Sequence, residues 1–268
     1  MAEYVLVDKP RPHVTLITLN RPERMNAMAF EVMLPFRDAI AQVRDDNDTR
    51  VVVLTGAGDG FCSGADMDNP GTMPNIDGLT RPIIGQRALG ILHEVIIAVR
   101  DMHQPVIGAI NGAAIGGGFC LSLATDIRIA AEEAYFRAAG INNGLTSTEL
   151  GISYLLPRAI GASRAFEIML SGRDVDAVEA DRIGLVSRVV PRSDLLEACY
   201  ELAARIIGFS RMGVEFTKRM LWSSLDAGSL HSQMDHETHA QLYVRLTTEN
   251  FEEAMRARKE GRPPVYLD

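Results

Sequence analysis

The sequence is poor in cysteine and has no excess of basic residues. Its three cysteines, Cys62, Cys120 and Cys199, lack metal-ligand spacing, and their odd number does not suggest a disulfide framework. We therefore expect reduced thiols and a cytoplasmic protein. The formal net charge of −8 provides no basic surface of the kind that phosphate backbones require. Nucleic acid is consequently not an expected partner.

Long hydrophobic runs are also missing. The apolar stretches are interrupted before the roughly 18 residues that a membrane-spanning helix needs. The N-terminal "MAEYVLVDKPRPHV" has no apolar segment of the signal-peptide type. The sequence therefore predicts neither a membrane partner nor a signal peptide.

What the chain does have is an alternation of short apolar runs and helical patterns. Its 268 residues, 47% of them hydrophobic, are enough for one large core or two small ones. The patterns predict strands at 13–20, 51–56, 105–111 and 126–131, and helices at 29–46, 83–102 and 116–124. Such alternation indicates an α/β fold with crossover connections. After about Pro191 the pattern is almost continuously helical, so we divide the chain into a core, 1–195, and a helical C-terminal region, 196–268.

A glycine-rich turn offers the clearest chemical signal. In "NGAAIGGGFCLSLATD", 111–126, three glycines follow a predicted strand and open a helix, whose first amides attract negative charge. "GFCSGADM", 60–67, likewise follows a buried strand and has small residues that allow close backbone approach. Amides from both segments could converge on one oxygen and form an oxyanion hole. The alternative is two tight turns that serve packing alone.

Other catalytic patterns fail or are weak. "VVVLTGAGDGF" has Phe61 where a dinucleotide-binding loop requires its third glycine. His236 and His239 lie three apart on a predicted helix, and a solvated helix face is preferred over a metal site. Cys120 could be a nucleophile, but its apolar helix favours a small buried residue. We expect no metal.

Five segments together resemble the enoyl-CoA hydratase/isomerase, or crotonase, family. They are "NRPERMNAM", "VVVLTGAGDGFCSGADM", "QPVIGAINGAAIGGGF", "ATDIRIAAEEAYF" and "SGRDVDAVEADRIGLVSRVV", within a resemblance that covers about residues 4–262. The resemblance implies a crotonase-like spiral of ββα units with a C-terminal helical trimerisation region. It also implies a homotrimer or a hexamer made of two trimers. The expected substrate is an acyl-CoA thioester, as in fatty acid metabolism, with no cofactor beyond its CoA.

By motif position, the resemblance assigns roles to individual residues. The backbone N–H groups of Ser63 and Gly117 would hold the thioester oxygen as an enolate forms. Arg24 is the expected phosphate contact. The other expected contacts to CoA or the acyl group are Ala27, Ala65, Asp66, Met67, Gly116, Cys120 and Gly140.

The two glutamates that typical hydratases of this family carry are not expected here. One would stand two residues after the last glycine of "GGG", which is Cys120, and the other four residues after Phe136, which is Gly140. Glu149 lies eight residues before Pro157, where relatives that isomerise dienoyl-CoA esters carry an acid. We predict that Glu149 is the acid/base, with a pKa raised by an apolar pocket. The alternative is a glutamate that stabilises a helix N-terminus. Asp126 is interpreted as structural.

Three functions follow, in order of preference. The first is hydration of 2-enoyl-CoA thioesters to 3-hydroxyacyl-CoA with Glu149 as a non-standard acid/base. The second is double-bond isomerisation of enoyl-CoA, for which one carboxylate suffices. The third is an acyl-CoA-binding protein with weak catalysis. Thioester hydrolysis and carbon–carbon cleavage share the oxyanion hole and stay open as minor alternatives.

Overall fold

The computed structural model describes residues 3–268, and its centre is a six-stranded sheet. The strand order is β1-β2-β3-β5-β7-β10, in which β1 is antiparallel to β2 and the other neighbours are parallel. The strands are β1 (Val5–Arg11), β2 (Val14–Leu19), β3 (Val51–Gly56), β5 (Val106–Ile110), β7 (Ile127–Ala131) and β10 (Arg188–Val190). The predicted α/β class with crossover connections is confirmed.

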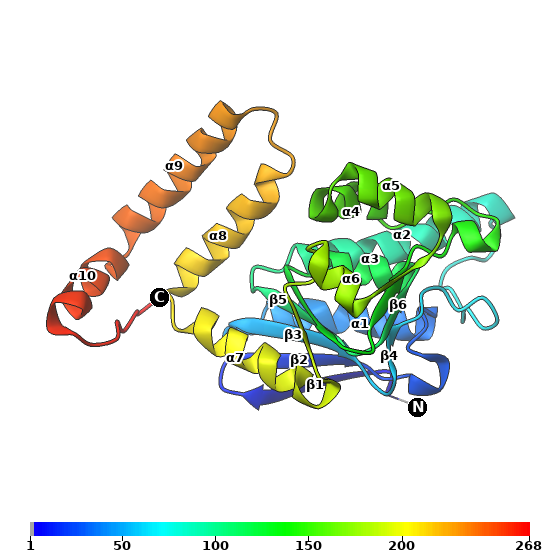
Figure 1. The fold of residues 1–268 in the computed structure, drawn as a ribbon, viewed down its shortest axis with the longest axis horizontal. Coiled ribbons are helices and arrows are strands. Elements are labelled where there is room, and N and C mark those ends of the chain that lie inside the picture. Colours follow the sequence, from blue (N-terminus) through cyan, green and yellow to red (C-terminus); the bar gives the residue numbers. More distant parts are fainter. Residues whose placement is uncertain (1–2) are drawn as a thin grey trace.

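A second sheet has four short strands in the order β4-β6-β8-β9. These are β4 (Gly60–Cys62), β6 (Ala113–Ile115), β8 (Tyr135–Arg137) and β9 (Asp174–Asp176). Each of β4, β6 and β8 follows a strand of the large sheet after a turn, and a helix follows β4 and β6. The chain thus advances as a spiral of strand, strand and helix (Figure 1).

Helices cover both faces of the large sheet. Alternate strand residues point to opposite faces, so Val52 and Leu54 join the core under α1 (Phe30–Arg44), α2 (Arg81–Arg100) and α3 (Gly117–Ala124). Val51 and Val53 instead pack under α7 (Leu195–Ile207). Because both faces are covered, the central strands β3 and β5 are buried along their whole length, as parallel strands generally are. Further helices follow β8 and β9: α4 (Ile152–Ile160), α5 (Ala162–Ser171) and α6 (Ala177–Arg182).

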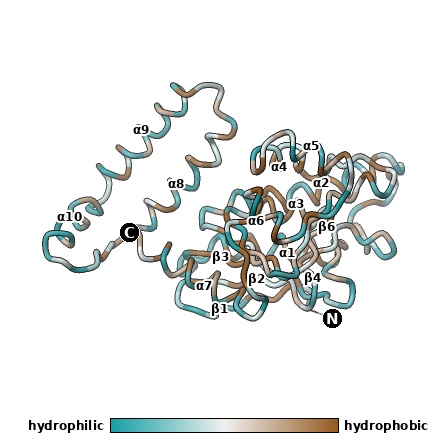
Figure 2. Tube along the Cα trace, in the orientation of Figure 1, coloured by the Kyte–Doolittle hydropathy of each residue, from teal (hydrophilic) through white to brown (hydrophobic). Residues whose placement is uncertain are grey.

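The last three helices extend away from this core (Figure 1). They are α8 (Arg211–Ser224), α9 (Leu230–Thr247) and α10 (Asn250–Glu260). Hydrophobic and hydrophilic residues alternate along them (Figure 2), and Leu221, Leu246 and Phe251 are 65%, 78% and 53% exposed. The predicted boundary at residue 195 falls on the first residue of α7, which packs on the sheet.

By length and composition alone, α2 could cross a membrane, and this differs from the expectation that no segment would qualify. One such helix is weak evidence, because core helices of soluble proteins pass the same test. Val95, Ile96 and Val99 of α2 are buried in the core. Arg37 Nη1 of α1 also lies 3.0 Å from Glu94 Oε2 of α2.

Candidate active site

Two buried asparagines hold the turns that lead to the glycine-rich segments. Asn26 accepts from the Arg21 amide at 2.8 Å and donates to the carbonyls of Ala57 and Gly60 at 2.9 and 2.8 Å. Asn111 donates to the Gly58 and Gly60 carbonyls from the following crossover. Sequence analysis had not singled out these side chains. They fix the exit of β3 and the start of β4, and so they place the segment 63–67.

The segments around Gly64 and Gly117 lie in direct contact. A Cβ atom on Gly64 would lie 3.1 Å from the Gly117 nitrogen and 2.6 Å from the Ile115 carbonyl oxygen. Gly64 also has φ of +81°, which L side chains rarely adopt. Glycine is therefore required there by space and by conformation. The convergence of the two segments that the sequence predicted is present.

The structure contradicts the expectation that the Ser63 amide is free. Ser63 N donates to the Met25 carbonyl at 3.0 Å, and its hydroxyl donates to the Arg24 carbonyl at 3.3 Å. The backbone amide of Ala65, two residues further on, is placed differently. The Met28 amide donates to the Gly64 carbonyl and the Asp66 amide to the Met28 carbonyl, so the intervening Ala65 amide points away from Met28. Ala65 is exposed, and within residues 3–268 its N–H has no backbone acceptor.

The Gly117 amide is available for a different reason. Gly117 is the first residue of α3, so its N–H has no acceptor within the helix. Gly116, in front of it, has φ of +52°, and its own amide is bound to the Arg137 carbonyl at 2.8 Å. Gly117 therefore offers an unbonded amide at the positive end of the α3 dipole.

Glu149 reaches this turn from another segment. Its Oε1 lies 3.3 Å from the position that a Cβ on Gly116 would occupy. The side chain is partly buried, and burial raises the pKa of Glu149 above its ordinary value. Among the described residues, no hydrogen bond or opposite charge acts on this pKa. Glu149 precedes α4, but no side-chain cap hydrogen bond is present at that helix.

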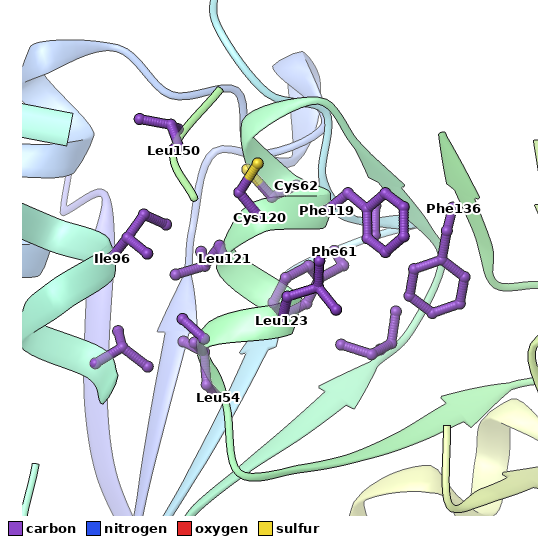
Figure 3. Close-up of a cluster of buried hydrophobic side chains, with 14 of the residues drawn as sticks. Leu54, Phe61, Cys62, Ile96, Phe119, Cys120, Leu121, Leu123, Phe136 and Leu150 are labelled. Atoms are coloured by element: carbon purple, nitrogen blue, oxygen red, sulfur yellow. The ribbon is translucent and has the colours of Figure 1, made fainter. Parts of the chain in front are cut away.

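The positions of the two missing glutamates are filled differently. Cys120 is fully buried in α3 (Figure 3), and its thiol donates to the Glu149 carbonyl at 3.4 Å. Burial, with a contribution from the Glu149 charge, raises the pKa of Cys120 well above its ordinary value, which argues against a thiolate nucleophile. At Gly140 a side chain would overlap the Thr146 carbonyl. An acid at residue 140 would require a different backbone.

Two of the residues expected at CoA, Arg24 and Asp66, belong to an ion-pair cluster. The Asp66 carboxylate is buried and lies 2.6 Å from Arg24 Nη2 and 2.9 Å from Arg21 Nη1. Hydrogen bonds from Arg24 hold the pKa of Asp66 well below its ordinary value. Arg24 also contacts Asp68 at 3.1 Å while its side chain stays 38% exposed. Met67 is exposed and Ala27 is buried. A phosphate contact of Arg24 stays a prediction.

Two apolar side chains at the site escaped the sequence analysis. The Met28 sulfur and Leu150 Cδ1 both pack against Gly117, and Leu150 Cδ1 lies 3.2 Å from the Cβ position there. Met28 and Leu150 are 4% and 5% exposed. Met28 is the last letter of "NRPERMNAM", and Leu150 directly follows the candidate acid, so the neighbouring motifs were the available signals.

A groove lies away from Gly117 and Glu149. A groove of about 860 Å³ runs between α8, α10 and the base of the sheet, lined in part by Trp222 and Phe251. Among residues 3–268 no three His, Cys, Asp or Glu side chains are grouped so as to hold a metal ion. His239 bonds through Nδ1 to the Asp235 carbonyl of its own helix at 2.7 Å.

Comparison with known proteins agrees with the fold and the motifs. Residues 11–268 match the family model described as enoyl-CoA hydratase/isomerase. A Mycobacterium tuberculosis protein named probable enoyl-CoA hydratase EchA12 is 64% identical over 98% of this chain and 93% of its own length. A Mycobacterium abscessus structure, described as a probable enoyl-CoA hydratase/isomerase, is 63% identical over 99% of each chain, with a TM-score of 0.95.

One further structure carries a narrower description. It is described as a monofunctional enoyl CoA isomerase from M. smegmatis and is 59% identical, covering 87% of this chain and 99% of its own, with a TM-score of 0.75. Together with the matching family model and the crotonase-fold neighbours, these similarities establish that the chain belongs to the enoyl-CoA hydratase/isomerase (crotonase) family.

Proposed function

We propose that this protein moves the double bond of an enoyl-CoA thioester, with Glu149 as the single acid/base. The observation that carries the proposal is the placement of one carboxylate beside the α3 N-terminus, where burial alone raises its pKa. Cys120 and Gly140 supply no second acid. Isomerisation needs one group that removes a proton from one carbon and returns it to another.

The proposed reaction balances without a cofactor beyond the CoA of the substrate. The Glu149 carboxylate takes a proton from C2 of a 3-enoyl-CoA, and the C–H electron pair passes to the thioester oxygen as an enolate. When the C2–C3 double bond forms, the C3–C4 π pair takes the proton from Glu149 at C4. The product is a conjugated 2-enoyl-CoA, and the carboxylate is regenerated.

The enolate oxygen would be held by two backbone amides. We assign this role to Gly117, as predicted, and to Ala65 in place of Ser63, because the Ser63 amide is already bound to Met25. One such donor contributes about 2.7–4 kcal/mol in the transition state. The exposed face of Ala65 and the positive end of α3 support the pairing.

Hydration of a 2-enoyl-CoA is the second candidate. The 64% identical relative from M. tuberculosis is named a probable enoyl-CoA hydratase, and this favours the order of preference that the sequence suggested. Hydration requires a bound water that attacks C3, and such a water needs two to four polar partners. Glu149 is the one unpaired carboxylate described at this turn, so the geometry favours isomerisation.

CoA binding and assembly complete the proposal. Arg24, partly exposed beside Asp66, would contact a CoA phosphate, with Ala27 and the 65–67 segment along the nucleotide and pantetheine. The exposed apolar residues of α8–α10 support a homotrimer or a pair of trimers. We propose a cytoplasmic location on the grounds of the cysteine content.

An absorbance assay tests the reaction directly. Purified protein is mixed with trans-3-hexenoyl-CoA and, separately, with trans-2-hexenoyl-CoA, and the conjugated-thioester absorbance is followed. We expect a rise with the 3-enoyl ester. Glu149→Gln should lower the rate by about 10²–10⁴-fold, whereas the exposed control Glu133→Gln should not. A fall with the 2-enoyl ester and no rise with the 3-enoyl ester would establish the hydratase instead.

A further inference from the structure

The carboxylate of Glu149 has no hydrogen-bond partner among residues 3–268, so the backbone that carries it sets its position. That backbone belongs to a loop, residues 138–149, which leaves β8 and leads into α4. Both ends of the loop border the same turn, because a Cβ on Gly116 would lie 3.3 Å from Glu149 Oε1 and 3.8 Å from the Ala139 Cβ. The contacts that fix the path of this loop therefore also fix the carboxylate.

One buried side chain ties the loop together. Within 141–148 every residue is exposed except Ser147, which is 7% exposed. Its hydroxyl accepts from the Ile141 amide at 3.2 Å and donates to the Ala138 carbonyl at 3.3 Å. A serine hydroxyl can accept and donate at the same time. Ser147 thus joins the segment that leads to Glu149 to the segment that leaves β8.

A glycine at residue 140 makes this path possible. A Cβ on Gly140 would overlap the Thr146 carbonyl and lie 3.2 Å from the Ser147 Cα, so the returning segment runs directly against Gly140. The Leu145 amide also donates to the Gly140 carbonyl at 2.9 Å. The φ of Gly140 is −54°, which any residue adopts, so space rather than conformation requires glycine. The lack of a side chain at residue 140 and the placement of Glu149 thus follow from one backbone path.

On its other side, Glu149 is held through its own carbonyl group. This carbonyl accepts from the Ile152 amide at 2.9 Å and from the Cys120 thiol at 3.4 Å. Between Glu149 and Ile152, Leu150 has φ of +46°, a left-handed conformation that strains a leucine. A thiol is a weak donor, so Cys120 adds little to the hold. The main side-chain restraint on this segment is therefore the hydroxyl of Ser147.

We infer that Ser147 is a positioning residue, which holds Glu149 at the α3 N-terminal turn by fixing the path of the 138–149 loop. This inference rests on the proposed function, in which Glu149 exchanges the proton. A misplacement of about 1 Å can lower a rate by about 10²-fold. Release of the loop should therefore slow the chemical step. It should leave KM nearly unchanged, because the segments expected to bind CoA, 24–27 and 65–67, lie outside the loop.

The kinetics of Ser147→Ala test this inference, with Ser210→Ala as the matched control. Ser210 is 8% exposed and accepts from the Gly213 amide at 2.9 Å at the start of α8, so Ser210→Ala also removes a buried hydroxyl. With trans-3-hexenoyl-CoA, Ser147→Ala should lower kcat by about 10- to 100-fold at a nearly unchanged KM. Ser210→Ala should keep the wild-type kcat. Ser147→Thr retains the hydroxyl and should recover most of the kcat.

The pH profile separates positioning from a loss of stability alone. A released Glu149 would be more exposed to water, so in Ser147→Ala the acid limb of kcat/KM should move toward the ordinary glutamate pKa of 4.5. In Ser210→Ala it should stay at the wild-type pH. Cys120 is the titratable group that faces Glu149 from α3, and burial raises its pKa well above the ordinary value, so the thiol stays protonated over this range.

Gly140→Ala displaces the loop from its other side, against Thr146, and serves if Ser147→Ala does not fold. It should change kcat and the acid limb in the same direction as Ser147→Ala. A Ser147→Ala enzyme with the kcat and acid limb of the wild type would overturn the inference. A lower kcat with an unmoved acid limb would also overturn it, because that result indicates a purely structural role.

Glu149→Gln separates these failures from failure of the proposed function. Undiminished turnover in Glu149→Gln would reject Glu149 as the acid/base, whatever Ser147→Ala does. Loss of turnover in Glu149→Gln with wild-type kinetics in Ser147→Ala would reject the role of Ser147 alone.

Discussion

The two ends of α3 each have a carboxylate beside them, and the two carboxylates are treated in opposite ways. At the C-terminal end, Asp126 accepts from Trp222 Nε1 at 2.6 Å and from the Val106 amide at 2.7 Å, and it lies 2.8 Å from Lys218 Nζ. At the N-terminal end, Glu149 has burial but no such partners among the described residues. A fully bonded acid fixes structure, whereas an unpaired one with a raised pKa is free to exchange a proton.

The charged groups around Asp126 confirm this contrast. Lys218 is 8% exposed and also donates to the Gln104 carbonyl at 2.9 Å. Burial lowers the pKa of Lys218 against the opposing effect of Asp126. Burial likewise lowers the pKa of Arg128 to about 10, with the Asp126 charge again opposing. Asp126 therefore joins α8 to the base of the sheet, as the structural interpretation of this residue anticipated.

The largest expected effect on stability comes from the C-terminal end. Asp126→Asn leaves the buried Lys218 without its counter-charge, and breaking a buried pair in this way costs about 3–5 kcal/mol. Urea unfolding should show this loss in the free energy of unfolding. The folded variant should keep its kcat. A stability equal to that of the wild type would show that Asp126 is not the link between α8 and the sheet.

The next largest effect is expected where the Gly64 segment approaches the N-terminal end of α3. In Gly64→Ala the new Cβ would lie 2.6 Å from the Ile115 carbonyl oxygen, in a residue with φ of +81°. Displacement of one amide donor should lower kcat by about 10²–10³-fold. Gly78→Ala is a matched control, because Gly78 also has positive φ but open space around it. Equal rates in the two variants would contradict the role of this close approach.

A smaller effect concerns pH, and its sign differs between stability and activity. Burial raises the pKa of Glu149 in the folded state above its ordinary value of 4.5. At a pH between the ordinary pKa and the raised pKa, the folded state therefore binds more protons than the unfolded state. The contribution of Glu149 to stability is thus full below pH 4.5 and is lost as pH rises through the raised pKa. Activity should rise over the same window, because the base must be ionised.

Two measurements check this pair of signs. Unfolding free energies of the wild type and Glu149→Gln should converge at low pH, and the variant should be relatively more stable at neutral pH. The kcat/KM profile of the wild type should show an acid limb above the ordinary glutamate pKa. An acid limb at or below that pKa would mean that Glu149 is not the group that titrates.

The smallest effect is expected at Cys120. The thiol donates one weak hydrogen bond to the Glu149 carbonyl, at 3.4 Å. Cys120→Ala should therefore cost about 1 kcal/mol of stability and retain most of the activity. Thermal unfolding and kcat measure both quantities. A loss as large as that of Glu149→Gln would restore Cys120 as a catalytic candidate.

The sequence predicted four of the six strands of the large sheet, missing β1 and β10, and none of the small sheet. Long apolar runs such as 51–56 identify buried strands, and 29–46 has clear helical spacing. The strands β4, β6, β8 and β9 have three residues each, too few for a period to be visible. The nearly continuous helical pattern predicted after about Pro191 is interrupted between α9 and α10 at Thr248, which has extended backbone.

At the site, glycine patterns predicted where segments meet but not which amides are free. Ser63 and Ala65 lie two residues apart in the same segment. The hydrogen-bond partner of each backbone amide decides which amide is free. That partner depends on the Met25–Met28 loop, which lies far away in sequence. The strain at Leu150 was equally hidden, because nothing in the letters "TELG" requires a left-handed leucine.

The most direct test of the account compares the two acids in one assay. The kcat for conversion of trans-3-hexenoyl-CoA is measured for Glu149→Gln and Asp126→Asn, each at saturating substrate and at a temperature where both are folded. The account predicts a loss of about 10²–10⁴-fold for Glu149→Gln and a kcat near that of the wild type for Asp126→Asn. Loss of turnover in Asp126→Asn with full turnover in Glu149→Gln would contradict the assignment of the chemistry to the N-terminal end of α3.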